Sequence, residues 1–317
     1  MSCPVISESS KKSGVRHVNV SKNHEGQRLD NYLIRHLKGV PKAAVYRLIR
    51  TGQVRINGRR SKPDHRVQGG DEVRIPPVRT LQTGPAEVSA AVIEQVRQAV
   101  IHRDRDYLVI NKPSGMAVHS GSGLGWGLID AVRQAWPEEF FELAHRIDRE
   151  TSGCIVVARN GKALQHLSGQ FRAGTVVKKY LCLLNGQLKE ARVLVDAPLL
   201  KNRQAAEHAV EVDEDGKPAR TQFTVLQVFS DSTYAEAEIF TGRTHQIRAH
   251  AAHIDMPLAG DPSYGNATLR KKWKSRGLNR LFLHAHQLSF QSPSGAGIDS
   301  HAGLPQALRE VLDRLEA

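Results

Sequence analysis

The chain of 317 residues is 40% hydrophobic, which is enough for two domains and a sizeable core. It contains no run of about 18 apolar residues, so a helix that spans a membrane is not expected. The first twenty residues are polar and basic and lack an apolar segment, which argues against secretion. The three cysteines, Cys3, Cys154 and Cys182, form no C-x-x-C pair, and this usage fits a reducing cytoplasm.

The formal net charge of +13 indicates a polyanionic partner. Residues 22–79 contain fourteen Lys or Arg and five Asp or Glu, so under a fifth of the chain carries most of the excess charge. A merely solvated basic face would give the same count. Aromatic residues make up 5% of the chain, which argues against a protein that grips single strands mainly by stacking. The charge pattern therefore favours nucleic-acid binding by the N-terminal part.

The N-terminal part predicts a small helix–hairpin domain over residues 21–78, preceded by a loose tail over residues 1–20. Leucines recur at four-residue spacing within residues 26–39 and predict an amphipathic helix there. Pro41 suits the first turn of a second helix, which Gly52 ends. A hairpin is expected to follow, with strands over 54–56 and 71–75 and a turn at Asn57-Gly58.

Beyond this domain the pattern predicts a linker over residues 79–100, ending in a short helix, and a second domain over residues 101–317. Strands outnumber helices, and many follow one another without an intervening helix. This order predicts an α+β domain around a mixed, mainly antiparallel sheet rather than a doubly wound one. Strands are expected at 107–110, 178–184, 222–229, 233–240 and 281–290, and helices over 161–172 and from Leu304 to Leu315.

One segment of the second domain combines polar groups suited to catalysis. Residues 145–153 read His-Arg-Ile-Asp-Arg-Glu-Thr-Ser-Gly and come directly before the apolar run at 155–158. The carboxylate of Asp148 thus lies beside Arg146 on a turn-rich segment at the mouth of a sheet. An aspartate in that place suits a catalytic nucleophile or base.

This segment resembles the H-R-L-D-x-x-T-S-G signature of the RNA pseudouridine synthases of the large ribosomal-RNA type, with Ile147 in place of the usual Leu. Residues 26–76 resemble the S4 RNA-binding module, and the whole resemblance spans about residues 26–290. The loop at 290–295 departs from the family's usual F-x-H-P-x-T-G. Further matching segments are 111–115 with Val118 and His119 (N-K-P-x-G-x-x-V-H), 179–181 (K-x-Y), 241–250 (T-G-R-T-H-Q-I-R-x-H) and 278–285.

The resemblance implies an isomerase that converts uridine to pseudouridine in bacterial 23S ribosomal RNA without a cofactor. Its implied catalytic residues are Asp148 as the essential carboxylate, Arg248 as the ion-pair partner of that carboxylate, and Tyr180 as a ring that stacks on the uracil. Arg248 could instead contact RNA, and Tyr180 could be an ordinary core residue. The implied RNA-binding residues are Arg146, which fills the place of the extruded base or clamps a phosphate, Ile247, which forms an apolar wall, and Arg243, Arg47, Arg50 and Arg55.

The reaction breaks the N1–C1′ glycosidic bond, rotates the uracil and rejoins it through C5, so no oxidation or reduction is involved. Two routes fit Asp148: attack at C1′ to form an ester, or removal of the C2′ proton to form a glycal. The residues do not choose between these routes.

No metal site is expected, because no cysteine or acidic cluster completes a tetrahedral set with His245, His250 and His253. His119 and His145 are expected to be hydrogen-bonded scaffold. The chain is expected to act as a cytoplasmic monomer without a membrane partner. Two rival functions remain open: a non-catalytic S4-type RNA-binding or ribosome-assembly factor, and a nucleic-acid N-glycosylase that would release free uracil.

Overall fold

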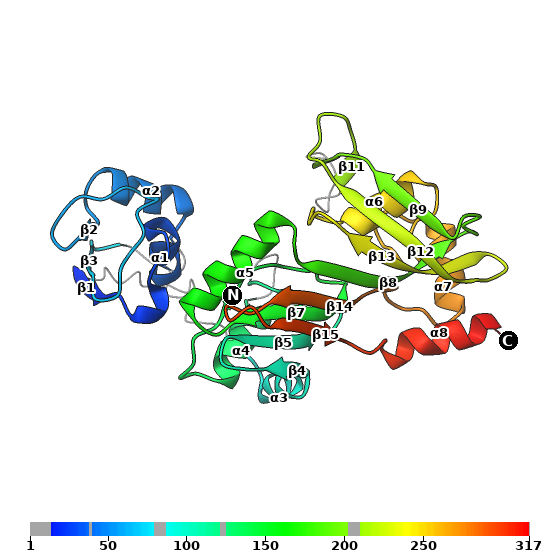
Figure 1. The fold of residues 1–317 in the computed structure, drawn as a ribbon, viewed down its shortest axis with the longest axis horizontal. Coiled ribbons are helices and arrows are strands. Elements are labelled where there is room, and N and C mark those ends of the chain that lie inside the picture. Colours follow the sequence, from blue (N-terminus) through cyan, green and yellow to red (C-terminus); the bar gives the residue numbers. More distant parts are fainter. Residues whose placement is uncertain (1–13, 38–39, 79–86, 121–124, 202–209, 317) are drawn as a thin grey trace, which may run out of the picture. The chain divides into compact units, whose positions relative to one another are not determined.

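The structure is a computed structural model, and it describes residues 14–37, 40–78, 87–120, 125–201 and 210–316. The chain divides into two compact units, one made of Met1–Glu87 with Asn160–Gln165 and the other of Val88–Arg159 with His166–Ala317 (Figure 1). None of the described helices is long and apolar enough to cross a membrane. Each unit has its own hydrophobic core.

The first unit packs two helices against a three-stranded antiparallel sheet. The leucines of the predicted helical stripe, Leu29, Leu33 and Leu37, are all buried, together with Val45 and Ile49 of the second helix. The elements are β1 (Arg16–Asn19), the short 3-10 helix η1 (Lys22–His24), α1 (Leu29–His36), α2 (Lys42–Arg50), β2 (Arg55–Ile56) and β3 (Glu72–Ile75), with the strand order β1-β3-β2.

The predicted turn is confirmed: Asn57 and Gly58 both have positive φ, and Ile56 and Arg59 exchange backbone hydrogen bonds across it. The returning strand β3 begins only at Glu72, so a longer segment than a simple hairpin separates it from the turn. The expected tail over residues 1–20 is wrong for its last part, because β1 pairs with β3 along its whole length. Residues 1–13 lie outside the described residues.

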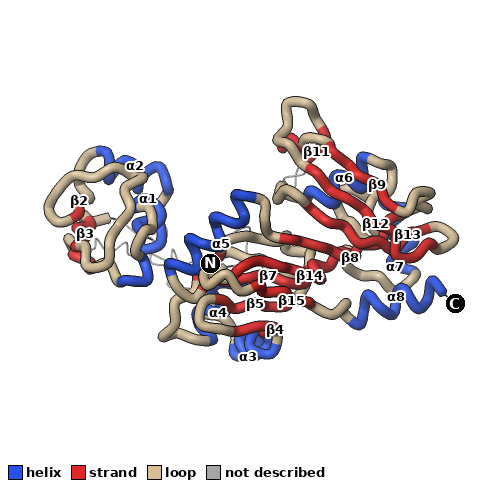
Figure 2. The backbone as a smooth tube through the Cα atoms, in the orientation of Figure 1, coloured by secondary structure: helices blue, strands red, loops and turns tan. Residues whose placement is uncertain are grey.

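The second unit contains a ten-stranded sheet that is antiparallel except where β7 pairs with β14, which confirms the predicted α+β architecture. Figure 2 shows its strands running through the middle of the unit, with helices at its margins. The strand order is β4-β5-β7-β14-β8-β13-β12-β9, with β6 on β7 and β15 on β14. The strands are β4 (Val100–Arg103), β5 (Tyr107–Lys112), β6 (Glu142–Leu143), β7 (Ser152–Ala158), β8 (Val177–Asn185), β9 (Arg192–Asp196), β12 (Arg220–Val228), β13 (Ser232–Ile239), β14 (Leu283–Gln291) and β15 (Gly297–His301), beside a separate pair, β10 (Leu199–Lys201) and β11 (Val210–Val212).

The expected linker over 79–100 is corrected by the structure, because the second unit already begins at Val88. The short helix expected there is α3 (Ala90–Gln98), and it packs on α4 through a hydrogen bond from Arg97 to the Ala135 carbonyl. The residues before Glu87 in this linker lie outside the described part of the chain. The other helices are α4 (Leu128–Ala135), α5 (Gly161–Ala173), α6 (Gln246–His253), α7 (Ala267–Ser275) and α8 (Gln306–Glu316).

Strands β7, β14 and β8 form the centre of the sheet, and the start of β7 and the middle of β8 reach the site described next. Cys154 on β7 and Cys182 on β8 are fully buried free thiols, as expected. Burial raises the pKa of Cys154 to about 12 and raises the pKa of Cys182 as well, so both stay protonated and unreactive at neutral pH.

Candidate active site

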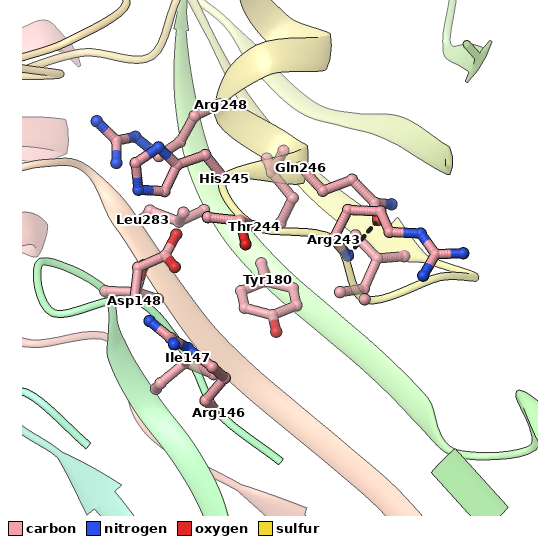
Figure 3. A pocket seen from close by; sticks show the side chains of 14 residues that line it. Arg146, Ile147, Asp148, Tyr180, Arg243, Thr244, His245, Gln246, Arg248 and Leu283 are labelled. Carbon is pink, nitrogen blue, oxygen red and sulfur yellow. Dashed lines mark hydrogen bonds between the residues drawn. The ribbon is translucent and has the colours of Figure 1, made fainter. Parts of the chain in front are cut away.

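The matched segments 145–153, 179–181, 241–250 and 278–285 meet in one pocket that is open to solvent and has a volume of about 100 Å³. Figure 3 shows the Asp148 carboxylate pointing into the space between the side chains of His245, Thr244 and Tyr180. The pocket is lined by Arg146, Ile147, Asp148, Thr151, Tyr180, Ile239, Gly242, Arg243, Thr244, His245, Gln246, Ile247, Arg248 and Leu283.

The loop that carries Asp148 ends at the point where β7 meets β14. Gly153 has φ +112, a conformation that L side chains rarely adopt, and a Cβ atom there would overlap the backbone of Ala285. The parallel pairing of Ser152 and Gly153 with His284 and Ala285 depends on that close approach. A glycine at this place therefore lets β7 start directly behind the loop and fixes where Asp148 emerges.

Lys112 supports the same loop from inside the protein. Its side chain is fully buried, and its Nζ atom donates hydrogen bonds to the carbonyls of Pro113, Met116 and Arg149 at 2.8–3.0 Å. Burial lowers the pKa of Lys112 to about 7. Arg149 is the neighbour of Asp148, and its carbonyl also accepts the backbone N–H of Gly115 at 2.9 Å. The Asn-Lys-Pro segment thus positions the catalytic loop.

A second brace comes from Arg280 and His284. Arg280 donates to the Ser152 hydroxyl at 2.8 Å, and that hydroxyl lies 2.8 Å from Nδ1 of His284. Because Nε2 of His284 faces the Ala302 carbonyl at 3.1 Å, Nε2 carries the proton and Nδ1 accepts from Ser152. Burial lowers the pKa of His284 to about 4, so the ring is neutral at pH 7 and each of its two nitrogens has a hydrogen-bond partner.

Asp148 itself is left available. Within the described part of the chain its carboxylate makes no hydrogen bond and no ion pair, and only its backbone carbonyl is used, by the N–H of Thr151 at 3.2 Å. The Asp148 charge nevertheless affects a neighbouring side chain. Burial is the larger cause of the raised pKa of Tyr180, and the Asp148 carboxylate is the second. A partly buried carboxylate with unused acceptor capacity is suited to react with a bound substrate.

The expected ion pair between Arg248 and Asp148 is not formed. Arg248 on α6 instead donates two hydrogen bonds of 2.7 Å to both oxygens of Asp261, and both side chains are almost completely buried. Arg248 pairs with Asp261 because the N–H groups of Ser263 and Tyr264 already hold the Asp261 carboxylate in place. Burial lowers the pKa of Arg248, but the hydrogen bonds and charge of Asp261 and the charge of Asp148 raise it overall.

Gln246 shapes the loop of the Thr-Gly-Arg-Thr-His segment. Its side-chain oxygen accepts from the Thr241 hydroxyl at 2.7 Å and from the Arg243 N–H at 3.0 Å, while its amide group donates to the Arg220 carbonyl and Thr221. Since all these groups are satisfied, the loop is held open in one shape. His245 comes directly before α6 as its N-cap residue, in the left-handed conformation with φ of 50°.

Two histidines of these motifs, His145 and His250, are held by hydrogen bonds as scaffold. His250 bonds to Thr221 and to the Ala197 carbonyl, both at 2.9 Å. His145 accepts the N–H of Val156 at 3.0 Å, and burial lowers its pKa to about 3. No group of three His, Cys, Asp or Glu side chains suited to a metal occurs among the described residues. The expectation is wrong for His119, whose ring makes no hydrogen bond with the described residues; burial lowers its pKa.

The remaining predicted residues fall into three groups. Tyr180 on β8 and Ile247 on α6 are buried and form the apolar side of the pocket. Arg146 and Arg243 are exposed at its rim, and Nε of Arg243 donates to the Pro218 carbonyl at 3.0 Å. The last group lies in the first unit and does not line the pocket; it consists of the exposed residues Arg47, Arg50 and Arg55.

Sequence reasoning assigned no role to Lys112, Arg280 or Asp261. The first two lie in segments that matched the family, so their segments were found but their hydrogen bonds were not. Asp261 lies in a Gly-Asp-Pro turn between the matched segments 241–250 and 278–285. The pattern that could have predicted its role is an acidic residue shortly after a helix that carries a buried arginine.

The comparisons with known proteins agree with this site. A family model for RNA pseudouridylate synthase matches residues 106–253, and an S4 domain model matches residues 27–73. The chain is similar to ribosomal large subunit pseudouridine synthase C of Haemophilus influenzae (42% identity, 96% of each chain) and of Escherichia coli (42%, 95% and 97%). Among solved structures, human RNA pseudouridylate synthase domain containing 4 aligns with a TM-score of 0.59 at 26% identity, over 71% of this chain and 96% of that one. The chain therefore belongs to the RNA pseudouridylate synthase family, together with the ribosomal large subunit synthases C.

Proposed function

We propose that this protein isomerises specific uridines to pseudouridine in 23S ribosomal RNA. Curated relatives of nearly the same length are named for the large ribosomal subunit, which supports the substrate class. The observation that carries the proposal is the free carboxylate of Asp148 in a pocket with an apolar side and a basic rim. Binding alone would not require an acid in that place, where it repels phosphate.

The substrate uridine must leave its stack before it can enter this pocket, at a cost of a few kcal/mol. Arg146 is exposed next to Asp148 and makes no hydrogen bond or ion pair with the described residues. Its guanidinium is therefore free to occupy the place of the extruded base, and Arg243 on the opposite side of the rim is placed to contact a phosphate.

Once the base is inside, Asp148 acts on the ribose. In one route its carboxylate attacks C1′ as N1 of the uracil leaves, and an ester links enzyme and ribose. In the other it removes the C2′ proton as the N1–C1′ bond breaks, and a glycal forms with the uracil released inside the pocket. Both routes require a carboxylate that no protein group already occupies, which is how Asp148 is held. The attraction of the nearby Arg248 guanidinium stabilises its charge once the substrate has excluded water.

Tyr180 supplies a ring surface for the detached uracil as it rotates. Because burial and the Asp148 charge raise its pKa, Tyr180 stays a neutral phenol and does not act as a base at neutral pH. Ile247 completes the apolar contact. The rejoined base then loses its C5 proton, and N1, which no longer bonds to C1′, takes up a proton, so the product is an isomer of the substrate.

The S4 unit provides affinity for the RNA through phosphate contacts. Arg47 and Arg50 project from α2 and Arg55 from β2, all exposed, so they can neutralise phosphates without desolvation. We place the reaction in the cytoplasm, carried out by a monomer, without a metal or a membrane partner.

The direct test incubates the protein with unmodified 23S rRNA and maps pseudouridine by carbodiimide-blocked primer extension. Wild type should produce new stops, and Asp148→Asn should bind the RNA equally well and produce none. Stops from both proteins would contradict the role of Asp148. Tight binding without any stops would favour the assembly-factor function, and release of free uracil would favour an N-glycosylase.

A further inference from the structure

Helix α7 (Ala267–Ser275) is the most basic element of the second unit that the reaction does not use. Residues 267–276 contain five Lys or Arg and no Asp or Glu. Two of the five are used in holding the helix, and three are turned outward. The five basic residues are Arg270, Lys271, Lys272, Lys274 and Arg276.

The inner side of α7 is firmly anchored. Trp273 is fully buried in an apolar cluster, and its ring N–H donates to the side chain of Asn185 at 2.6 Å. Lys272 and Arg276 lie over the Trp273 ring, 4.8 and 5.2 Å from its centre, and both pair with Asp231 at 2.8–2.9 Å. These contacts account for the two inner charges.

The outer side of α7 carries the other three charges. At about 100° per residue, Arg270, Lys271 and Lys274 fall within an arc of about 100°, on a different side from Trp273. All three are exposed, and none has an acidic partner within the described part of the chain. Three exposed charges of one sign repel each other, so their joint placement is explained by an anionic partner rather than by stability.

The loop before α7 connects this outer side to the pocket. Asp261 in that loop holds Arg248, and the ring of Tyr264 lies 5.0 Å from the same guanidinium. Arg270 of α7 donates back to the carbonyls of Pro262 and Gly265. Lys271 is seven residues from Tyr264, so the chain places it at most about 25 Å from Tyr264, whose ring lies against the pocket residue Arg248.

We propose that the outer side of α7, formed by Arg270, Lys271 and Lys274, binds phosphates of the RNA strand beside the extruded uridine. This inference rests on the proposed function and adds a second RNA-docking surface, on the catalytic unit itself. Extrusion of one nucleotide leaves its flanking backbone strained, and fixed cations near the pocket hold that backbone in place. The partner is RNA because evenly exposed, unpaired cations suit a run of phosphates.

The test compares two variants with the same loss of charge. Lys271→Gln/Lys274→Gln removes two outer cations that make no hydrogen bond with the described residues, and the control Arg105→Gln/Arg172→Gln removes two exposed cations from the β4–β5 turn and from α5, neither of which belongs to the apolar cluster that holds α7. Binding of a 23S rRNA fragment is measured at several salt concentrations. Each lost phosphate contact should reduce the slope of log affinity against log salt by about 0.7 to 0.9.

For the α7 variant we expect the slope of log affinity against log salt to be smaller than the wild-type slope by about 1.4 to 1.8. The control variant should keep the wild-type slope. Equal slopes for the two variants would overturn the proposal, and so would a loss seen only with a protein-bearing ribosomal particle, because that would indicate an acidic protein partner. Both variants should have the same melting temperature as the wild type, because neither substitution removes a buried group.

Pseudouridine formation at saturating RNA separates this inference from the proposed function. The α7 variant should keep the wild-type rate there, because its two lysines touch no reacting atom. If wild type forms pseudouridine but the α7 slope matches the control, only the docking surface is wrong. If wild type forms none while the slope falls, the docking surface stands and the function is wrong.

Discussion

Two aspartates are held in opposite ways: Asp148 lines the pocket, whereas Asp261 binds Arg248, which lines it. The carboxylate of Asp261 receives two hydrogen bonds from Arg248 and two from backbone N–H groups. The carboxylate of Asp148 receives none from the described residues, and its loop is held through its backbone carbonyls instead, by Lys112 and by Ser114. The difference teaches that one carboxylate is used for structure while the other is kept free for the substrate.

The largest effect should come from removing the free carboxylate. Asp148→Asn should lower kcat by at least about 10⁴-fold, because the amide neither attacks C1′ nor removes a proton. Its free energy of unfolding should stay within about 0.5 kcal/mol of wild type, since the side chain makes no hydrogen bond. Primer extension and urea unfolding measure the two quantities. A large loss of stability would show that Asp148 is structural after all.

Removing the structural carboxylate should reverse this pattern. Asp261→Asn leaves the buried Arg248 without its counter-charge and should lower the free energy of unfolding by about 3–5 kcal/mol. Asp231→Asn is the comparison, because its partners Lys272 and Arg276 are partly exposed and water can solvate them, so the loss should be smaller, about 1–2 kcal/mol. If urea unfolding finds equal losses in the two variants, the buried pair does not fix the pocket.

The neutral brace behind the Asp148 loop should make the fold sensitive to mild acid. The pKa of His284 is about 4 in the folded protein and 6.5 in the unfolded chain, so acid protonates the unfolded state first. The stability it contributes is present above pH 6.5 and lost as the pH falls toward 4, about 3 kcal/mol in all. Urea unfolding between pH 7 and 4 should show a flatter curve for His284→Gln, and an unchanged curve would exclude His284 as the cause.

The smallest effect on chemistry should come from the first unit, none of whose residues lines the pocket. Replacing Arg47, Arg50 and Arg55 by Gln should weaken RNA binding about tenfold to a hundredfold and reduce the salt slope by about 2. The rate at saturating RNA should stay at the wild-type value, because both carboxylates keep their surroundings. A lower saturating rate with unchanged affinity would place these arginines in the reaction instead of in docking.

Much of this protein follows from local sequence patterns. The leucine stripe of α1, the Asn57-Gly58 turn and the strands β8, β12, β13 and β14 were predictable, because periodicity and turn chemistry act over a few residues. The motif segments also predicted which residues would line the pocket, since Asp148, Tyr180 and Arg248 all do.

Tertiary structure decided the partners. Arg248 binds Asp261 rather than Asp148, Arg280 braces Ser152 across 128 residues, and β1 turns the end of an expected tail into a strand by pairing with β3. Such contacts depend on which groups from distant segments are buried and fixed by other hydrogen bonds. A local sequence pattern does not predict this. The sequence by itself determined which chemical groups gather at the pocket, and only the fold decided which carboxylate stays free, because hydrogen bonds between distant segments are settled by their competition in three dimensions.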